Sequence, residues 1–367
     1  MSQRVSILCV AGARPNFMKV APVIAALEGR NIAAPLVHTG QHYDAAMSDS
    51  FFADLGIPPP RVNLEVGSGS HAVQTAEIMR RFEPVLDEVN PQAVLVVGDV
   101  NSTIACALVA AKKGIKIVHV EAGLRSYDRA MPEEINRVLT DQISDLLFVT
   151  ERSAIANLAR EGIAEARVHF VGNVMIDTLF RHLESAMPAS ATLAGRFPGG
   201  HVLATLHRPS NVDEPAVLGP LLRAIETIAR TIPVVFPLHP RTRGRIEAAG
   251  LGAILEDPRI LALPPLGYLE ILGLMRDARF VVTDSGGIQE ETTALGVPCF
   301  TVRENTERPI TIAEGTNTLV GTDPSALLSA IDALWAGRGK AGRIPELWDG
   351  RAAQRIAAIL EDALIPA

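Results

Sequence analysis

Short apolar runs alternate with longer stretches of helical composition throughout the chain. Runs of about four to eight apolar or β-branched residues are typical of buried parallel strands. In the first half, such runs fall at 4–11, 35–39, 93–98, 116–120, 145–150 and 167–171. The stretches between them read as helices, with Pro15 and Pro132 near two predicted starts and Gly114 at a predicted end. The first half therefore predicts a parallel, doubly wound α/β sheet.

The same pattern begins again after a change in composition. A predicted helix at about 174–184 is followed by residues 187–200, whose Ala, Pro, Gly and Ser content indicates a connection between domains. Further strands are predicted at 201–206, 232–238, 259–263, 279–284, 298–302 and 318–320. We therefore expect an α/β protein of two Rossmann-like domains, 1–172 and 173–350, whose parallel doubly wound sheets face a central cleft. The apolar stripe of a last helix, about 351–367, predicts that it packs back on the first domain.

The composition fits a globular protein and disfavours some partners. The 367 residues are 48% hydrophobic and 20% charged, which allows two well-packed domains. A net charge of −7 and an aromatic content of 4% disfavour a nucleic-acid binder. No signal peptide is recognised, and no apolar run approaches the ~20 residues of a membrane span. The three cysteines lack metal or disulfide spacing, so we expect free thiols in the cytoplasm and no membrane association.

A candidate anion site lies in FVVTDSGGIQEE, residues 280–291. Here an apolar strand turns through Ser285, Gly286 and Gly287 into a predicted helix. Free N–H groups and the helix dipole favour phosphate at such a helix start, although a tight turn without a ligand has the same sequence. Glu291 lies about one turn further along, where a carboxylate can accept hydrogen bonds from ribose hydroxyls.

A second junction of this kind follows the first strand, where Arg14 and Lys19 can both point at a helix start. It lacks the GxGxxG fingerprint of dinucleotide-binding folds. In the second half, His207, His239 and Arg308 each follow a predicted strand, the position where functional side chains gather. A neutral core histidine is the plain alternative for His207, and an arginine at 308 can clamp phosphate or an acidic side chain.

Three carboxylates form a candidate proton-transfer site. Asp99 and Glu121 stand at the carboxyl ends of predicted strands, and Glu133 lies in the first turn of the helix that begins at about 132. If they converge on one cleft, mutual repulsion and burial raise at least one pKa towards neutrality. A helix cap or a solvated helix start is the alternative for each residue alone.

The apolar stripe of that helix predicts which of its faces is buried. Ile135, Val138 and Leu139 are expected to face the core, which leaves Glu133 and Arg137 on the outer face as an i,i+4 ion pair. No Cys/His cluster has metal-ligand spacing and no Walker or GxSxG pattern occurs, so neither a metal nor a cofactor is expected.

The chain resembles the non-hydrolysing UDP-N-acetylglucosamine 2-epimerase family. The matching stretches are spread over most of the chain: GARPNFMK (12–19), GDVNST (98–103), HVEAGLRS (119–126), MPEEINR (131–137), GNVMIDTL (172–179), DSGGIQEE (284–291) and TERP (306–309). The resemblance implies a GT-B fold, with the nucleotide sugar between two domains, and a homodimer.

The resemblance also implies roles for particular residues. Asp99, Glu121 and Glu133 match the family's acid/base carboxylates, and His207 matches a histidine beside the departing diphosphate. Glu291 is implied to hold the ribose hydroxyls, and His239 matches a residue near a second, activating site. The implied contacts of the UDP portion are Arg14, Lys19, Ser285, Gly286, Gly287 and Arg308, with Leu266 and Ile271 beside the uracil.

The implied reaction interconverts UDP-GlcNAc and UDP-ManNAc through UDP elimination to 2-acetamidoglucal and re-addition, without NAD or a metal. Two departures leave the substrate open. Ser210 stands where many members have Glu, and the loop at 40–48 resembles relatives that act on UDP-2,3-diacetamido-2,3-dideoxyglucuronate. A GT-B glycosyltransferase is the alternative in another enzyme class.

Overall fold

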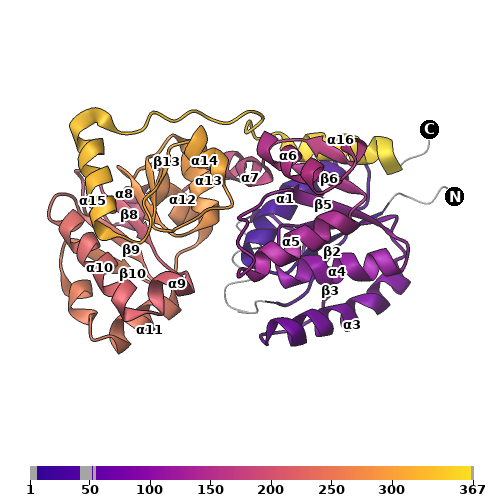
Figure 1. The fold of residues 1–367 in the computed structure, drawn as a ribbon, viewed down its shortest axis with the longest axis horizontal. Coiled ribbons are helices and arrows are strands. Elements are labelled where there is room, and N and C mark those ends of the chain that lie inside the picture. Colours follow the sequence, from indigo (N-terminus) through magenta and orange to yellow (C-terminus); the bar gives the residue numbers. More distant parts are fainter. Residues whose placement is uncertain (1–5, 42–51, 53–54, 365–367) are drawn as a thin grey trace. The chain divides into compact units, whose positions relative to one another are not determined.

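The computed structural model describes residues 6–41, 52 and 55–364, so part of the loop at 40–48 lies outside the described residues. The chain divides into two compact units, Met1–Arg181 with Glu346–Ala367, and His182–Pro345. Each unit has its own sheet of parallel strands with helices packed around it (Figure 1). The predicted α/β class with two parallel, doubly wound sheets is confirmed.

Seven strands form the sheet of the first unit, in the order β3-β2-β1-β4-β5-β6-β7. They are β1 (Ile7–Ala11), β2 (Leu36–His38), β3 (Val62–Asn63), β4 (Ala93–Val97), β5 (Lys116–Ala122), β6 (Leu146–Val149) and β7 (Val168–Phe170). The helices are α1 (Arg14–Glu28), α3 (His71–Val89), α4 (Asn101–Lys112), α5 (Pro132–Ile143), α6 (Arg152–Arg160), α7 (Val174–His182) and α16 (Ala352–Leu364). Strand β3 was not predicted, because two residues carry no periodicity.

Six strands form the sheet of the second unit, in the order β10-β9-β8-β11-β12-β13. They are β8 (Val202–Thr205), β9 (Val234–Pro237), β10 (Ile260–Leu263), β11 (Val281–Thr283), β12 (Cys299–Thr301) and β13 (Asn317–Leu319). The helices include α8 (Ala189–Thr192), α9 (Pro209–Val212), α10 (Pro215–Ala229), α11 (Pro240–Ala248), α12 (Tyr268–Arg276), α13 (Gly286–Leu295), α14 (Pro309–Ala313) and α15 (Pro324–Ala333).

The central strands are buried along their whole length, which explains why they read as unbroken apolar runs. All five residues of β1 and all five of β4 are buried. Because helices cover both faces of a parallel sheet, only the strand ends carry polar residues. In such sheets ligands bind beyond the carboxyl ends of the strands, near the point where the strand order reverses. In the first sheet this point lies between β1 and β4.

The first unit continues past the predicted boundary at 172/173 to residue 181, because α7 packs within it. Thr178 donates a hydrogen bond to the carbonyl oxygen of Met18 on α1. The carboxylate of Asp177 accepts from the backbone N–H groups of Ala352 (3.1 Å) and Ala353 (2.7 Å) at the start of α16. The C-terminal helix α16, yellow in Figure 1, lies beside α1 in this unit.

Helix α5 is turned the opposite way from the prediction. Ile135 and Leu139, expected in the core, are 42% and 50% exposed. Its buried face is polar instead and includes Arg137, Thr140 and Asp141. The apolar stripe was identified correctly, but the side of the helix that faces the protein was wrong. The reason is a buried network of charged side chains, which belongs to the candidate site.

Candidate active site

The first group of site residues lies at the carboxyl ends of β4 and β5. These strands are neighbours, with Val97 opposite Val120, so Asp99 and Glu121 stand at the same edge of the sheet. Glu121 is 5% exposed and its φ is 71°, in the left-handed region, next to a register shift between β5 and β6. Such a conformation costs a non-glycine residue about 1–3 kcal/mol and persists only where the surroundings fix it.

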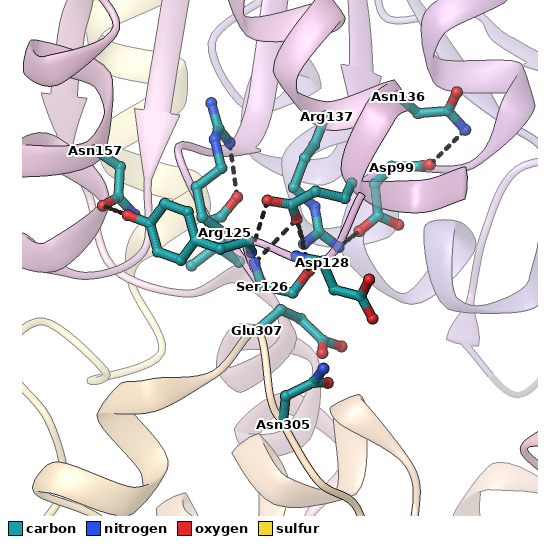
Figure 2. A network of polar contacts seen from close by, with 12 residues as sticks. Asp99, Arg125, Ser126, Asp128, Asn136, Arg137, Asn157, Asn305 and Glu307 are labelled. Atoms are coloured by element: carbon teal, nitrogen blue, oxygen red, sulfur yellow. Dashed lines mark hydrogen bonds and ion pairs between the residues drawn. The ribbon is translucent and has the colours of Figure 1, made fainter. Parts of the chain in front are cut away.

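A cation lies directly beside each of these two carboxylates. Lys19 on α1 places its Nζ 2.5 Å from Oε2 of Glu121, and both side chains are buried. Arg137 on α5 pairs with Asp99 and lies 2.6 Å from Oε2 of Glu134 (Figure 2). The sequence had suggested carboxylate next to carboxylate, whereas the structure gives each of the two a cation as its immediate neighbour.

Glu134, which the sequence analysis missed, is the buried carboxylate of α5. It accepts hydrogen bonds of 2.9 Å from the backbone N–H and the hydroxyl of Ser126, and one of 2.9 Å from the backbone N–H of Tyr127. Arg137 therefore pairs with Glu134 rather than with the predicted Glu133, because residues 134 and 137 share the buried face. Glu133 is half-buried at the start of the helix.

A fully buried histidine and aspartate connect the two strand ends. Asp141 on α5 lies 2.7 Å from Nδ1 of His119 and accepts from the backbone N–H of Gly123 (3.1 Å) and from Arg125 (2.7 Å). The other ring nitrogen of His119 lies 2.9 Å from the carbonyl oxygen of Gly98. Burial raises the pKa of Asp141, but His119 and Arg125 outweigh it and hold that pKa below its usual value.

This network fixes the backbone on both sides of Asp99 and Glu121. Sequence reasoning missed His119 and Asp141 because each is a single polar residue within an element that was expected to bury apolar side chains. The only available signal was the histidine among the apolar residues 117–120 of the predicted strand. A buried polar group of this kind requires partners.

The start of α1 is packed tightly against the same edge. A Cβ on Gly12 would lie 2.0 Å from the hydroxyl oxygen of Ser102, so only glycine fits there. Asn16 donates to the carbonyl oxygen of Val97 at 3.0 Å and thereby ties α1 to β4. Arg14 is the first residue of α1 and is half-buried.

In the second unit, the strand–turn–helix junction has the predicted form. Strand β11 ends at Thr283, whose hydroxyl accepts from the backbone N–H of Ser285 at 3.0 Å, and α13 begins at Gly286. The side chain of Ser285 makes no capping hydrogen bond, and Ser285, Gly286 and Gly287 are half-buried. A Cβ on Gly286 would lie 2.9 Å from Oε1 of Glu307, so a carboxylate of the protein approaches this helix start closely.

Arginines surround that carboxylate. Glu307 lies 2.8 Å from Nη2 of Arg303 and 3.5 Å from Nη2 of Arg208. Burial raises its pKa, but the charges of Arg308, Arg303 and Arg208 hold the pKa of Glu307 far below its usual value. Arg308, predicted to clamp phosphate or an acidic side chain, places Nε 2.8 Å from Oε1 of the buried Glu290. The sequence predicted a role for Arg308 of the TERP motif, but not for Glu307 in the same motif.

Beside this junction, His207 is held by the residue directly after β11, Asp284. Its Nδ1 lies 2.8 Å from Oδ1 of Asp284, which is completely buried, while the His207 side chain is 45% exposed. The ring of His239, at the start of α11, lies 6.4 Å from that of His207. Asp284 was read as the end of a strand and its contact with His207 was not foreseen, because the two are 77 residues apart.

The candidate ribose ligand Glu291 is buried on α13 and accepts a hydrogen bond of 2.9 Å from the hydroxyl of Tyr268. Burial, opposed by this hydrogen bond and assisted by the charge of Glu290, raises the pKa of Glu291 to about 7. Leu266 and Ile271 flank Tyr268 at the start of α12 and are half-buried. Nothing in the sequence had marked Tyr268.

The predicted site residues therefore form one group in each unit. The first unit brings together Arg14, Lys19, Asp99, Glu121, Glu133 and Arg137 around the ends of β1, β4 and β5. In the second unit they follow the ends of β8, β9, β10, β11 and β12: His207, His239, Leu266, Ile271, Ser285, Gly286, Gly287, Glu291 and Arg308. Within the described ranges, no helix is long and apolar enough to cross a membrane, and no three His, Cys, Asp or Glu residues gather as metal ligands.

Comparison with solved structures gives the class of protein. The chain matches the crystal structure of Methanocaldococcus jannaschii UDP-GlcNAc 2-epimerase in complex with UDP-GlcNAc and UDP, with a TM-score of 0.90 and 40% identity. The match covers 98% of this chain and 100% of that one. The fold is therefore that of the GT-B type, as predicted.

Sequence comparison gives the family. The UDP-N-acetylglucosamine 2-epimerase of Methanococcus maripaludis is 42% identical over 330 residues, 88% of this chain and 90% of that one. The UDP-2,3-diacetamido-2,3-dideoxy-D-glucuronate 2-epimerase of Pseudomonas aeruginosa is 44% identical over 319 residues, 86% of this chain and 88% of that one. The family model for UDP-N-acetylglucosamine 2-epimerase matches residues 25–361. The chain belongs to this family, which confirms the predicted resemblance.

Proposed function

We propose that this chain is a non-hydrolysing UDP-N-acetylglucosamine 2-epimerase that interconverts UDP-GlcNAc and UDP-ManNAc. One observation carries the proposal: Asp99 and Glu121, two carboxylates of the family motifs, stand at the same sheet edge in a chain 40% identical to a UDP-GlcNAc 2-epimerase whose crystal structure is in complex with UDP-GlcNAc and UDP. The family membership over 25–361 supports the same activity.

The second unit is proposed to hold UDP. Backbone N–H groups at the start of α13 and the helix dipole suit the diphosphate. Glu291 suits the ribose hydroxyls, since a carboxylate accepts from both, and its buried position prevents water from competing. The apolar side chains of Leu266 and Ile271 suit the face of a base. Further proposed contacts of the UDP-sugar are Arg14, Lys19, Arg137, His239 and Arg308.

The chemistry needs proton transfer on both faces of the sugar. The C1–O bond to UDP breaks while a carboxylate removes the proton from C2, giving 2-acetamidoglucal and UDP. A second group then protonates C2 from the other face, and the UDP oxygen forms its bond to C1 again. Asp99, Glu121 and Glu133 are the proposed acid/base groups, and His207 is proposed to act beside the departing diphosphate. No redox step occurs, so no cofactor is required.

Incubation with UDP-GlcNAc in D2O tests this function. We expect deuterium at C2 of both UDP-GlcNAc and UDP-ManNAc, detected by NMR, with UDP-sugar remaining the dominant product. Unchanged protium at C2 after prolonged incubation would refute epimerisation. Transfer of the sugar to an acceptor without exchange at C2 would indicate a glycosyltransferase, and free ManNAc with UDP would indicate a hydrolysing epimerase.

A second substrate has a specific observation in its favour. The relative from Pseudomonas aeruginosa, named for UDP-2,3-diacetamido-2,3-dideoxy-D-glucuronate, is as similar to this chain as the relatives named for UDP-GlcNAc. The same exchange experiment with that sugar nucleotide decides between them. A kcat/KM for the diacetamido sugar at least tenfold above that for UDP-GlcNAc would assign the chain to the alternative substrate.

A homodimer is proposed on the exposed apolar stripe of α5. Ile135 and Leu139 lie one turn apart and are 42% and 50% exposed, and a self-complementary contact would cover both. Light scattering should give twice the chain mass, and Leu139→Lys should give the monomer mass.

Three buried free thiols, Cys9, Cys106 and Cys299, support the proposed location in the reducing cytoplasm.

A further inference from the structure

The carboxylate of Asp284 is a fully buried hydrogen-bond acceptor at the end of β11. It accepts from the backbone N–H groups of His207 (3.0 Å) and Arg208 (2.9 Å) and from the side-chain amide of Asn211 (3.2 Å). Its Oδ1 also lies 2.8 Å from Nδ1 of His207. Burial raises the pKa of Asp284, but these hydrogen bonds and the charge of His207 hold it below its usual value. A carboxylate of this kind can accept a hydrogen bond but cannot donate one.

This contact determines the protonation pattern of the His207 ring. Since Asp284 accepts, Nδ1 of His207 must carry a proton, and the exchangeable position is Nε2. The side chain is 45% exposed, and its ring contact with Asp284 is made through Nδ1, on the opposite side of the ring from Nε2. The neutral ring therefore has its lone pair at Nε2, and the protonated ring has an N–H donor there.

The groups around the ring favour this arrangement. His239 lies across from His207, and its own Nδ1 accepts from the backbone N–H of Arg241 at 3.2 Å. Burial, the charge of His207 and that of Arg241 lower the pKa of His239 against the opposing charge of Asp284, which disfavours a second positive charge beside His207. Arg208, the next residue, points its Nε to the carbonyl oxygen of Asp284 at 3.2 Å. Asp284 is thus the carboxylate in direct contact with the His207 ring.

We infer that Asp284 is a positioning residue, which orients His207 so that Nε2 faces the oxygen of UDP that leaves C1 and returns to it. The inference rests on the proposed function. As the C1–O bond breaks, the Nε2–H of protonated His207 donates to the UDP oxygen, which takes up the bonding electron pair. When that oxygen attacks C1 again, the proton returns to Nε2, so the ring ends the cycle as it began. Asp284 keeps its charge throughout and stabilises the imidazolium.

Loop anchoring is the competing explanation, since Asp284 also holds the backbone of residues 207 and 208. The chain offers a matched control. Thr242, fully buried, donates its hydroxyl to the carbonyl oxygen of Leu206, directly before His207, whereas the hydrogen bonds of Asp284 are to His207, Arg208 and Asn211. Thr242→Val removes this anchor at nearly constant volume, while the Asp284–His207 contact stays intact.

The kinetic test compares Asp284→Asn, His207→Gln, the double variant and Thr242→Val in the epimerisation assay. We expect each of the first two to lower kcat by about 10²–10³-fold, with KM changed by less than about threefold. The double variant should lose no more than the poorer single variant, because the two residues act as one unit. Thr242→Val should retain kcat within about threefold. Multiplicative losses, or an equal loss in Thr242→Val, would overturn the inference.

A spectroscopic test reads the tautomer directly in the wild type and does not depend on activity. In 15N-labelled full-length wild-type protein, NMR correlations between the carbon-bound ring protons and the ring nitrogens identify the tautomer. The His207 signals are assigned as those that disappear in the His207→Gln variant. We expect neutral His207 to be the Nδ1–H tautomer, with its lone pair at Nε2. A ring protonated at Nε2 alone would contradict the inference. If the tautomer is as expected but the wild type does not exchange C2 of either sugar nucleotide, the proposed function fails instead.

Discussion

Protonation of Glu291 should make the binding of the sugar nucleotide depend on pH. In the free chain, burial raises the pKa of Glu291 to about 7, and the hydroxyl of Tyr268 occupies one of its oxygens. The two ribose hydroxyls are both donors, so they bind the ionised carboxylate better than the neutral acid. Binding must then release a proton from Glu291, and affinity must rise as the pH rises through about 7.

The size of the effect follows from the pKa. If only the ionised form binds, the apparent Kd is multiplied by one plus the ratio of neutral to ionised Glu291. With a pKa of about 7, that factor is about 11 at about pH 6 and about 1.1 at about pH 8. Affinity should therefore improve about tenfold between these pH values, which is about 1.4 kcal/mol.

Isothermal titration calorimetry with UDP-GlcNAc measures both the affinity and the proton release. UDP-GlcNAc is preferable to UDP because its diphosphate has no terminal group that titrates near neutral pH. The heat measured in two buffers of different ionisation enthalpy gives the number of protons released. Glu291→Gln is the matched control, since it retains the side-chain size but cannot ionise.

The comparison with Glu291→Gln removes the contributions of other groups, including His207 and His239. The wild type should gain about tenfold in affinity over this range relative to the variant, and should release about half a proton more at about pH 7. Equal pH dependence in the two proteins would refute the reasoning. Wild-type affinity that falls as the pH rises, relative to the variant, would refute it as well.

Three further outcomes are expected. Glu134→Ala should lower the free energy of unfolding by about 3–5 kcal/mol, because it removes one of the two carboxylates paired with the buried Arg137 and the acceptor of the Ser126 and Tyr127 N–H groups. Glu133→Ala should change it by less than about 1 kcal/mol; urea denaturation compares the two variants. Lys19→Met should lower kcat at least tenfold more than it weakens UDP binding, because its ammonium lies on Glu121; a loss confined to UDP affinity would contradict this. Burial raises the pKa of Asp177 to about 6, so the wild type should lose up to about 3 kcal/mol of stability relative to Asp177→Asn as the pH rises from about 4 through about 6; parallel curves would exclude this linkage.

The sequence was sufficient for the features that depend on local pattern. The apolar runs located nearly all of the strands, because each is buried on both faces. The turn at Ser285–Gly287 was recognised from its residue types alone, and the family followed from motifs in a fixed order. These features need only neighbouring residues, so a single sequence contains them.

Contacts between distant residues could not be predicted in the same way. Asp284 and His207 follow two different strands, β11 and β8. The residues next to a carboxylate at a strand end are the same whether it caps a helix or accepts a hydrogen bond from an imidazole, so the sequence does not reveal its partner. Lys19 was assigned to phosphate because a cation near a helix start is attracted to any anion. The structure pairs it with Glu121, a residue about a hundred positions later in the chain, and this ion pair could not be predicted from local pattern.

The inverted helix α5 shows why one periodic pattern can be assigned to the wrong face. A 3.6-residue period identifies the two faces of a helix, and the usual assumption is that the apolar one is buried. Here the polar face is buried because Arg137 and Asp141 find fully matched partners at the ends of β4 and β5, and a completely satisfied network avoids the cost of isolated buried charges. The apolar stripe of Ile135 and Leu139 must then point away from the sheet. The buried network at the active site and the exposed stripe proposed for dimer formation are thus two consequences of the same helix orientation.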